Sequence, residues 1–84
     1  MYTEVLSDSE YEFEDLRYEL SRDMGEPLSE RTLWYWLENL RIHKDEYGFY
    51  HYSDLELLRA WVQNRNKFKT FKRFNQWRIK NYAS

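Results

Sequence analysis

Three side chains that often contact ligands stand close together on one predicted helix. Arg31, Trp34 and Tyr35 fall outside the apolar stripe of that helix, so all three are expected to face solvent. Large aromatic side chains are costly to leave in water unless they serve a binding surface. Such a helix would read base edges and phosphates of DNA, but Trp, Tyr and Arg are equally typical of protein-interface hot spots. We favour nucleic-acid contact for these residues, and contact with a protein partner or simple packing stays open.

The helix that carries these side chains is predicted over 29–40. Ser29 precedes an apolar-periodic run and occupies the N-cap position, where a hydroxyl accepts a hydrogen bond from a free amide of the first turn. The residues of the buried stripe recur at helical spacing: Leu33, Trp36, Leu37 and Leu40.

A first helix is predicted over 10–24, after an N-terminal stretch, 1–9, that is expected to be flexible. Ser9 would cap this helix, while Gly25 and Pro27 would end it. The order of helix, short turn and helix is the outline of a helix-turn-helix.

A short two-stranded β-hairpin is predicted over 41–52. Gly48 supplies the positive φ that such a turn requires. On this hairpin Lys44, Tyr50 and His51 are candidates to touch a phosphate backbone. The alternative is that the hairpin aromatics cover the core, which we favour for Tyr52.

A third helix is predicted over 54–66, because Ser53 and Glu56 have the spacing of a capping box. A bend is expected near 64–66. The last segment, 67–82, alternates bases with aromatic residues and predicts a basic-aromatic C-terminal helix. Its bases Lys69, Lys72 and Arg73 are candidate phosphate contacts. Alternatively, its aromatics pack on the preceding helix and its bases are solvated or paired with acids.

The net charge of −2 conceals a division of the chain. Residues 1–30 hold ten acids and two bases, whereas residues 31–84 hold eleven bases and five acids. No acid occurs after Glu56. A basic half favours an anionic partner such as nucleic acid, unless the two halves neutralise each other within the fold.

Several functional classes are disfavoured by what the chain lacks. There is no cysteine for a disulfide or thiolate site, no glycine-rich phosphate loop, and no nucleophile paired with a histidine. His43 and His51 are the only histidines, and without nearby acids at ligand spacing they make a poor metal site. We therefore expect no enzyme activity, no cofactor and no metal. No apolar run reaches membrane-spanning length, so a cytoplasmic protein without a membrane partner is expected.

Two short motifs resemble the DNA-binding domain of MerR-like regulators and the related excisionases. The helix motif is matched by Arg31, Thr32, Leu33 and Tyr35, and the end of the family's wing by Gly48, Tyr52 and Ser53, with Leu55 shortly after. The resemblance covers about 20–62. Trp34 and Tyr50 stand where that family has two further arginines. In that family the second helix enters the major groove and the wing lies against the backbone or minor groove, which implies base or phosphate contact by Arg31 and phosphate contact by Tyr35.

The sequence thus predicts one mainly α domain of the winged helix-turn-helix type, with three to four helices and a hairpin wing. The expected function is double-stranded DNA binding in a transcription-related bacterial, phage or plasmid-type regulator. The alternative is a protein-interaction adaptor that uses Trp34 and Tyr35 or the acidic first helix. Monomer and homodimer both stay open. The predicted nucleic-acid contacts are Arg31, Trp34, Tyr35, Lys44, Tyr50, His51, Lys69, Lys72 and Arg73.

Overall fold

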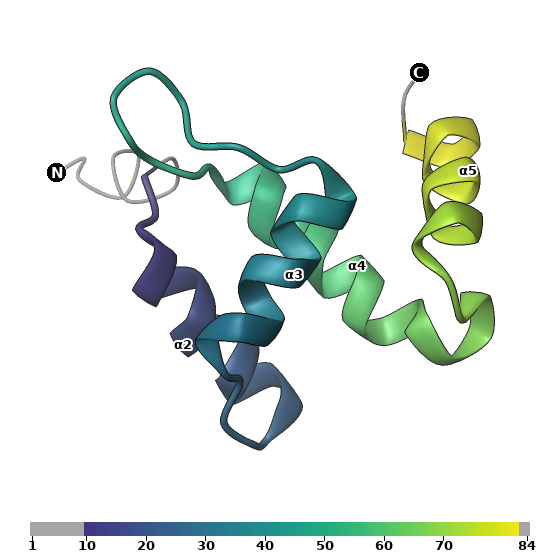
Figure 1. Ribbon diagram of the computed structural model, residues 1–84, viewed down its shortest axis with the longest axis horizontal. Helices are drawn as coiled ribbons and strands as arrows, with labels where there is room; N and C mark the ends of the chain where they lie inside the picture. Colours follow the sequence, from purple (N-terminus) through teal and green to yellow (C-terminus); the bar gives the residue numbers. More distant parts are fainter. Residues whose placement is uncertain (1–9, 83–84) are drawn as a thin grey trace, which may run out of the picture.

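The computed structural model describes residues 10–82 and contains four α-helices and no β-strand over that range. The helices are α2 (Phe13–Met24), α3 (Glu30–Leu40), α4 (Tyr52–Phe68) and α5 (Phe71–Tyr82). Figure 1 shows the chain turning back between α2 and α3, and a long loop leading to α4, which runs toward α5. The prediction of a small, mainly helical domain is confirmed. The predicted flexibility of 1–9 lies outside the described residues.

The first described helix, α2, begins three residues later than predicted. The Glu12 amide donates to the Asp15 carboxylate over 2.9 Å and so marks the start of the helix. Tyr11 lies outside the helix, because its backbone forms an antiparallel bridge with Tyr50. The predicted end is confirmed, because Gly25 adopts a φ of 73° and its amide donates to the Ser21 carbonyl over 2.9 Å.

The predicted cap and buried face of α3 are both confirmed. The Ser29 hydroxyl accepts a hydrogen bond of 3.1 Å from the Thr32 amide, which satisfies one free donor of the first turn. The turn before it is held to α2, since the Leu28 amide donates to the Ser21 hydroxyl over 3.0 Å. The whole predicted stripe is buried: Leu33, Trp36, Leu37 and Leu40.

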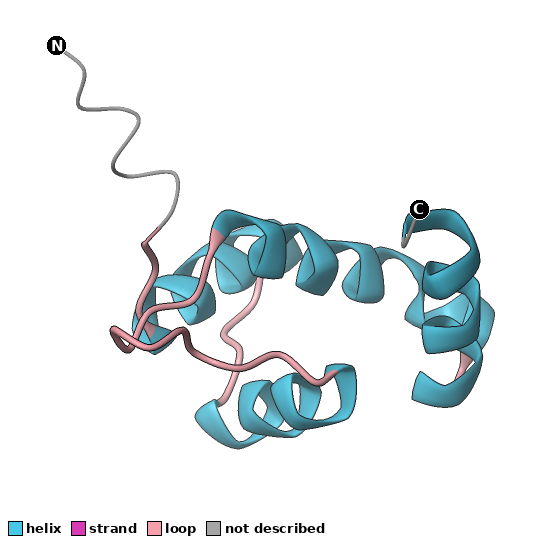
Figure 2. Cartoon of the chain, turned by 90° about the horizontal axis from the view of Figure 1, so that it is seen from above, coloured by secondary structure: helices cyan, strands magenta, loops and turns pink. Residues whose placement is uncertain are grey.

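The predicted β-hairpin over 41–52 is wrong, and Figure 2 draws the connection between α3 and α4 as loop. The Asp45 carboxylate accepts hydrogen bonds from the amides of Tyr47 (2.9 Å) and Phe49 (3.0 Å). A side chain therefore takes donors that a strand ladder would use. Gly48 does adopt a positive φ, of 90°. Beyond the turn, Tyr50 exchanges two backbone hydrogen bonds of 2.8 Å with Tyr11 rather than with the start of the loop.

The start of α4 also differs from the prediction. The helix begins at Tyr52 with His51 as the N-cap, and the His51 amide donates to the Asp54 carboxylate over 2.9 Å. The Ser53 and Glu56 spacing is therefore not the one that begins the helix. Tyr52 becomes the first helical residue and is 44% exposed, so its predicted place in the core is wrong.

The break between the last two helices lies at Lys69 and Thr70, not at the predicted bend near 64–66. Lys69 ends α4 in a left-handed conformation with a φ of 67°. The Thr70 hydroxyl then accepts from the Arg73 amide over 3.2 Å, as a helix N-cap does. The predicted single helix over 67–82 is therefore α5 alone, preceded by the end of α4.

The core joins all four helices and the loop. Phe74 of α5 is fully buried, and its ring lies 5.4 Å from Trp61, 5.8 Å from Phe68 and 5.6 Å from Trp77, measured between centroids. The leucines of α2, α3, α4 and the turn before α3 continue this core: Leu16, Leu20, Leu28, Leu33, Leu37, Leu40, Leu55 and Leu58. The alternative in which the tail aromatics pack on Trp61 is confirmed for Phe74.

Replacing Lys69 with glycine is expected to stabilise the fold by up to about 1 kcal/mol. A side chain in the left-handed region costs roughly 1–2 kcal/mol, and glycine removes that cost while adding some flexibility to the unfolded chain. Urea unfolding followed by circular dichroism measures the difference. Lys69→Ala is the matched control, because it removes the same charge but keeps the Cβ. Equal stability of the two variants would contradict the assigned backbone conformation.

Candidate nucleic-acid interface

The predicted pair of exposed aromatics on α3 is exposed, but its two rings lie on different sides of the helix. Trp34 is 51% exposed and stacks on Phe13 of α2, with centroids 4.5 Å apart. Tyr35 is 58% exposed and meets Phe71 of α5 edge-on at 5.6 Å. The Trp34 ring therefore belongs to the α2 side of the molecule and the Tyr35 ring to the α5 side.

A shallow hollow lies on the Trp34 side, between the start of α2, the start of α3 and the loop. Its walls combine aromatic rings with three carboxylates: Glu12, Phe13, Glu14, Glu30, Trp34, Lys44, Tyr47, Gly48 and Phe49. Carboxylates disfavour a nearby phosphate. Lys44 is exposed beside this hollow, so the structure places it with Trp34 rather than with the bases of α5.

The other two predicted loop contacts have structural roles. Tyr50 is only 2% exposed, so the prediction that its side chain touches DNA is wrong. Burial raises the pKa of the Tyr50 hydroxyl, and the negative charge of Asp54 raises it further. The His51 ring nitrogen Nε2 lies 2.7 Å from the Asp45 carboxylate. His51 thus joins the turn of the loop to the start of α4.

The tight turn of this loop predicts a specific response to acid. Hydrogen bonds from the Phe49 and Tyr47 amides, and His51 beside it, hold the pKa of Asp45 below its ordinary value of 3.8. A lowered pKa in the folded state stabilises the fold above that ordinary value, and the contribution is lost as the pH falls through the folded pKa. Below about pH 4 the wild type should lose this stabilisation.

Thermal unfolding of Asp45→Asn between about pH 6 and pH 2 tests the response. The variant should be less stable than the wild type at pH 6, and the difference should shrink in acid. Glu46→Gln, an exposed acid of the same turn, is the control and should follow the wild type. A stability difference for Asp45→Asn that does not change with pH would contradict the assigned role.

The predicted bases of the C-terminal segment are exposed. Lys69 lies at the end of α4, and Lys72 and Arg73 lie in the first turn of α5. Burial of Phe74 directs the opposite face of α5 to solvent, and this face contains Lys72, Arg73, Gln76, Ile79 and Lys80. We call these five residues the basic face of α5.

The acids of α2 and the bases of α5 are separated in space. Within residues 10–82, every ion pair involves Arg17, Arg22, Arg59 or His51. Arg59 of α4 joins α2 through Asp23 (2.6 Å) and Glu19 (3.2 Å). In the same part of the chain, the basic face of α5 forms no ion pair. Figure 1 shows α2 and α5 at opposite ends of the molecule, so the acidic helix does not cover the basic one.

The contact between α3 and α5 relates Arg31 to these bases. Tyr35 meets Phe71, and one turn later the Asn75 side chain donates to the Asn39 carbonyl over 3.2 Å. The two helices therefore run in the same direction along their contact. Arg31 lies one turn before Tyr35, which places it at the end of the contact where α5 begins. Arg31 is exposed and has no ion-pair partner within the described residues.

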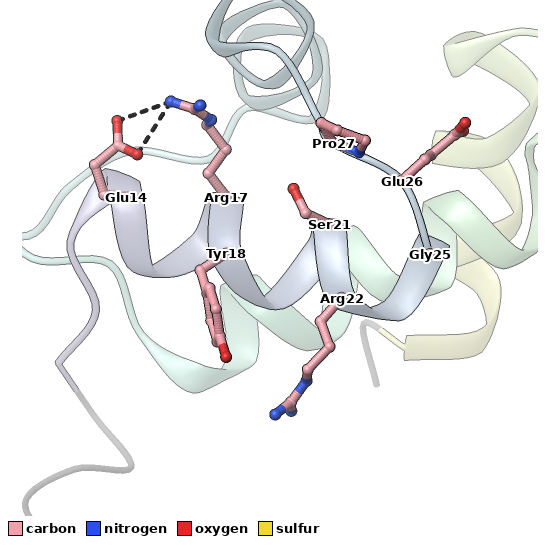
Figure 3. Close-up of a pocket in the computed structure, with 8 residues that line it drawn as sticks. All are labelled: Glu14, Arg17, Tyr18, Ser21, Arg22, Gly25, Glu26 and Pro27. Atoms are coloured by element: carbon pink, nitrogen blue, oxygen red, sulfur yellow. Dashed lines mark hydrogen bonds and ion pairs between the residues drawn. The ribbon is translucent and has the colours of Figure 1, made fainter.

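A second hollow, beside the turn between α2 and α3, is accounted for by the fold. Figure 3 shows Arg17 paired with Glu14 at its edge. The same guanidinium also donates to the Leu28 carbonyl over 2.9 Å and to Glu30 over 3.2 Å. The polar groups of this hollow therefore stabilise the turn between α2 and α3, and we assign no ligand to the hollow.

Two arginines that sequence reasoning missed line a third hollow. Arg41 and Arg78 come from the end of α3 and from α5, and both line a groove that reaches the start of α4. The only sequence signal was the absence of acids after Glu56, which left Arg78 without an obvious partner. Their proximity depends on the packing of α5 against α3.

Comparison of the chain with protein-family models, with curated proteins and with solved structures finds no match. The likeness to MerR-like domains accordingly rests on the residues quoted for it. Within residues 10–82, no helix has the length and apolar character that crossing a membrane requires. In the same residues, no group of three or more histidines and acids is placed to hold a metal ion.

Proposed function

We propose that this protein binds double-stranded DNA as a transcription-related regulatory module of the helix-turn-helix type, without a hairpin wing. The proposed contact surface consists of Arg31 and Tyr35 of α3, and Lys69, Lys72 and Arg73 at the junction of α4 and α5. Trp34, Lys44 and His51 lie outside this surface, and Tyr50 lies in the core.

The observation that carries the proposal is the basic surface without ion pairs that adjoins α3. Helix α5 meets α3 through the Tyr35 and Phe71 contact, its bases Lys72 and Arg73 follow Phe71 directly in sequence, and the acidic α2 lies at the far end. Phosphate binding requires bases that are not already neutralised, because affinity comes from releasing the counterions of the DNA. This supports contact of α3 and α5 with one duplex.

Fluorescence anisotropy of a labelled mixed-sequence duplex, titrated at several salt concentrations, tests the proposal. About four phosphate contacts predict that affinity falls roughly 10²-fold between 50 mM and 200 mM salt. Arg31→Ala should bind more weakly than the wild type. Arg22→Ala, an exposed arginine of α2, is the matched control and should bind like the wild type. No binding at 50 mM salt, or affinity that salt does not change, would overturn the proposal.

A protein-interaction adaptor is the second candidate, and the acidic aromatic hollow at Trp34 favours it. Carboxylates beside exposed rings suit the side chain of lysine or arginine, since a cation is attracted to both. Trp34→Ala separates the two candidates. Under the DNA proposal this variant should change the affinity for the duplex less than about twofold, because Trp34 lies outside the basic surface. A loss of affinity as large as that of Arg31→Ala would show that Trp34 contacts the duplex.

A further inference from the structure

A groove of about 730 Å³ lies on the part of the molecule where α3 ends, α4 begins and α5 passes. Its apolar walls come from all three elements: Leu40, Ile42, Leu57 and Ile79. Tyr52 and Ile79 are large side chains exposed at this groove. Apolar side chains exposed around a hollow are typical of a surface that binds a partner.

Two guanidinium groups in this groove lack a counter-charge. Arg41 and Arg78 both line it, and neither forms an ion pair within the described residues. The Nη1 atom of Arg78 is enclosed and has no hydrogen-bond partner. Burial lowers the pKa of Arg78, and the positive charge of Arg41 lowers it further. The two guanidinium charges repel each other, so an anion in the groove would offset this repulsion.

The two carboxylates that also line this groove, Asp54 and Glu56, do not supply this anion. The Asp54 carboxylate accepts from the His51 amide over 2.9 Å at the start of α4. The Glu56 carboxylate lies 3.8 Å from Arg59 and accepts a hydrogen bond from the Tyr52 hydroxyl, which raises the pKa of that hydroxyl. Both acids thus have partners of their own. Among the residues that the structure describes, no negative charge within the groove is left to compensate Arg41 and Arg78.

We propose that this groove binds an acidic, apolar segment of a protein partner. A carboxylate of the segment pairs with Arg41 and Arg78, and a neighbouring apolar side chain of the segment lies between Ile42 and Ile79. A phosphate alone would use the arginines but would leave the apolar walls exposed to water, so the chemistry of the groove favours a peptide. This inference does not rest on DNA binding, since the groove lies beyond the proposed DNA contacts.

Two blocked peptides provide the probe: acetyl-Leu-Glu-Leu-Phe-amide and the same peptide with glutamine in place of glutamate. Titration of the isotope-labelled full chain is followed by the arginine Nε–Hε signals in nuclear magnetic resonance spectra. The glutamate peptide should shift the Arg41 and Arg78 signals and bind at least about tenfold more tightly than the glutamine peptide.

Arg41→Gln should weaken binding of the glutamate peptide by about tenfold or more. This residue is exposed, so the fold is expected to survive the change. Lys80→Gln, on the basic face of α5 outside the groove, is the matched control and should bind like the wild type. Arg78→Gln provides a second variant with the same expected loss, and its circular dichroism spectrum checks folding.

Three outcomes would overturn the proposal. In the first, the two peptides bind equally. In the second, inorganic phosphate or a duplex at matched concentration produces the same shifts and affinity, which would make the groove a general anion site. In the third, sedimentation shows that Arg41→Gln dissociates a dimer, which would make a second copy of the chain the occupant.

Discussion

Replacing Phe74 with alanine is expected to reduce the free energy of unfolding by about 3–5 kcal/mol. Phe74 is fully buried and its ring touches an aromatic cluster contributed by α4 and α5. The substitution removes a large apolar surface and leaves a cavity that the surrounding rings cannot fill without changing their rotamers. Since small domains have only about 5–15 kcal/mol of stability, the variant should be largely or partly unfolded at 37 °C.

Urea unfolding of Phe74→Ala, followed by both circular dichroism and tryptophan fluorescence, measures the loss. Phe74→Leu is the matched control, because it keeps most of the apolar volume and should cost roughly 1–1.5 kcal/mol. A loss below about 1 kcal/mol for Phe74→Ala would show that α5 is not held by this cluster.

Reversing two charges on α5, in Lys72→Glu/Arg73→Glu, is expected to lower the affinity for a duplex by about 10²-fold or more at 50 mM salt. Each lost phosphate contact releases one counterion fewer, so the slope of log affinity against log salt should also decrease by about 2. Both side chains are exposed, and the fold is expected to survive their replacement. Anisotropy titrations at four or more salt concentrations give both quantities.

Arg22→Glu/Lys44→Glu is the control for the double reversal, because it changes the net charge equally but at exposed positions away from α5. Its affinity should stay within a few-fold of the wild type, and its salt slope should not change. Equal losses in the two double variants would mean that net charge, rather than a surface on α5, governs binding.

The features of this fold that were predictable from the sequence are the local ones. Ser29 and the stripe from Leu33 to Leu40 define α3, because a cap and a helical period depend only on neighbours within a few residues. Gly25 ends α2 for the same reason. These signals predicted two successive helices joined by a short turn, and the exposure of Arg31, Trp34 and Tyr35.

The loop and the start of α4 were mispredicted because contacts distant in sequence decide them. The bridge between Tyr11 and Tyr50 joins segments 39 residues apart, and no periodic pattern of apolar residues in the sequence predicts it. Two overlapping pairs, His51 with Asp54 and Ser53 with Glu56, both have capping-box spacing in the sequence. Only the first is realised, since Tyr11 holds the backbone before His51 and Asp45 holds its ring.

The candidate site was predictable as a set of exposed residues but not as a surface. Sequence spacing placed Trp34 and Tyr35 together as neighbours off the apolar stripe. The two rings lie on different sides of α3 because Trp34 stacks on Phe13 of α2, whereas Tyr35 contacts Phe71 of α5. The Arg41 and Arg78 pair depends in the same way on tertiary packing, which a helical period does not encode.

The separation of acidic α2 from basic α5 gives the molecule a large electric dipole moment despite its small net charge. Near a polyanion the protein is therefore turned, before any contact, so that α5 approaches first. We expect the same moment to make two free copies attract each other head to tail in dilute buffer. Added salt screens that attraction within about 10 Å at 0.1 M, so we expect self-association to weaken over the same range of salt as the proposed DNA binding.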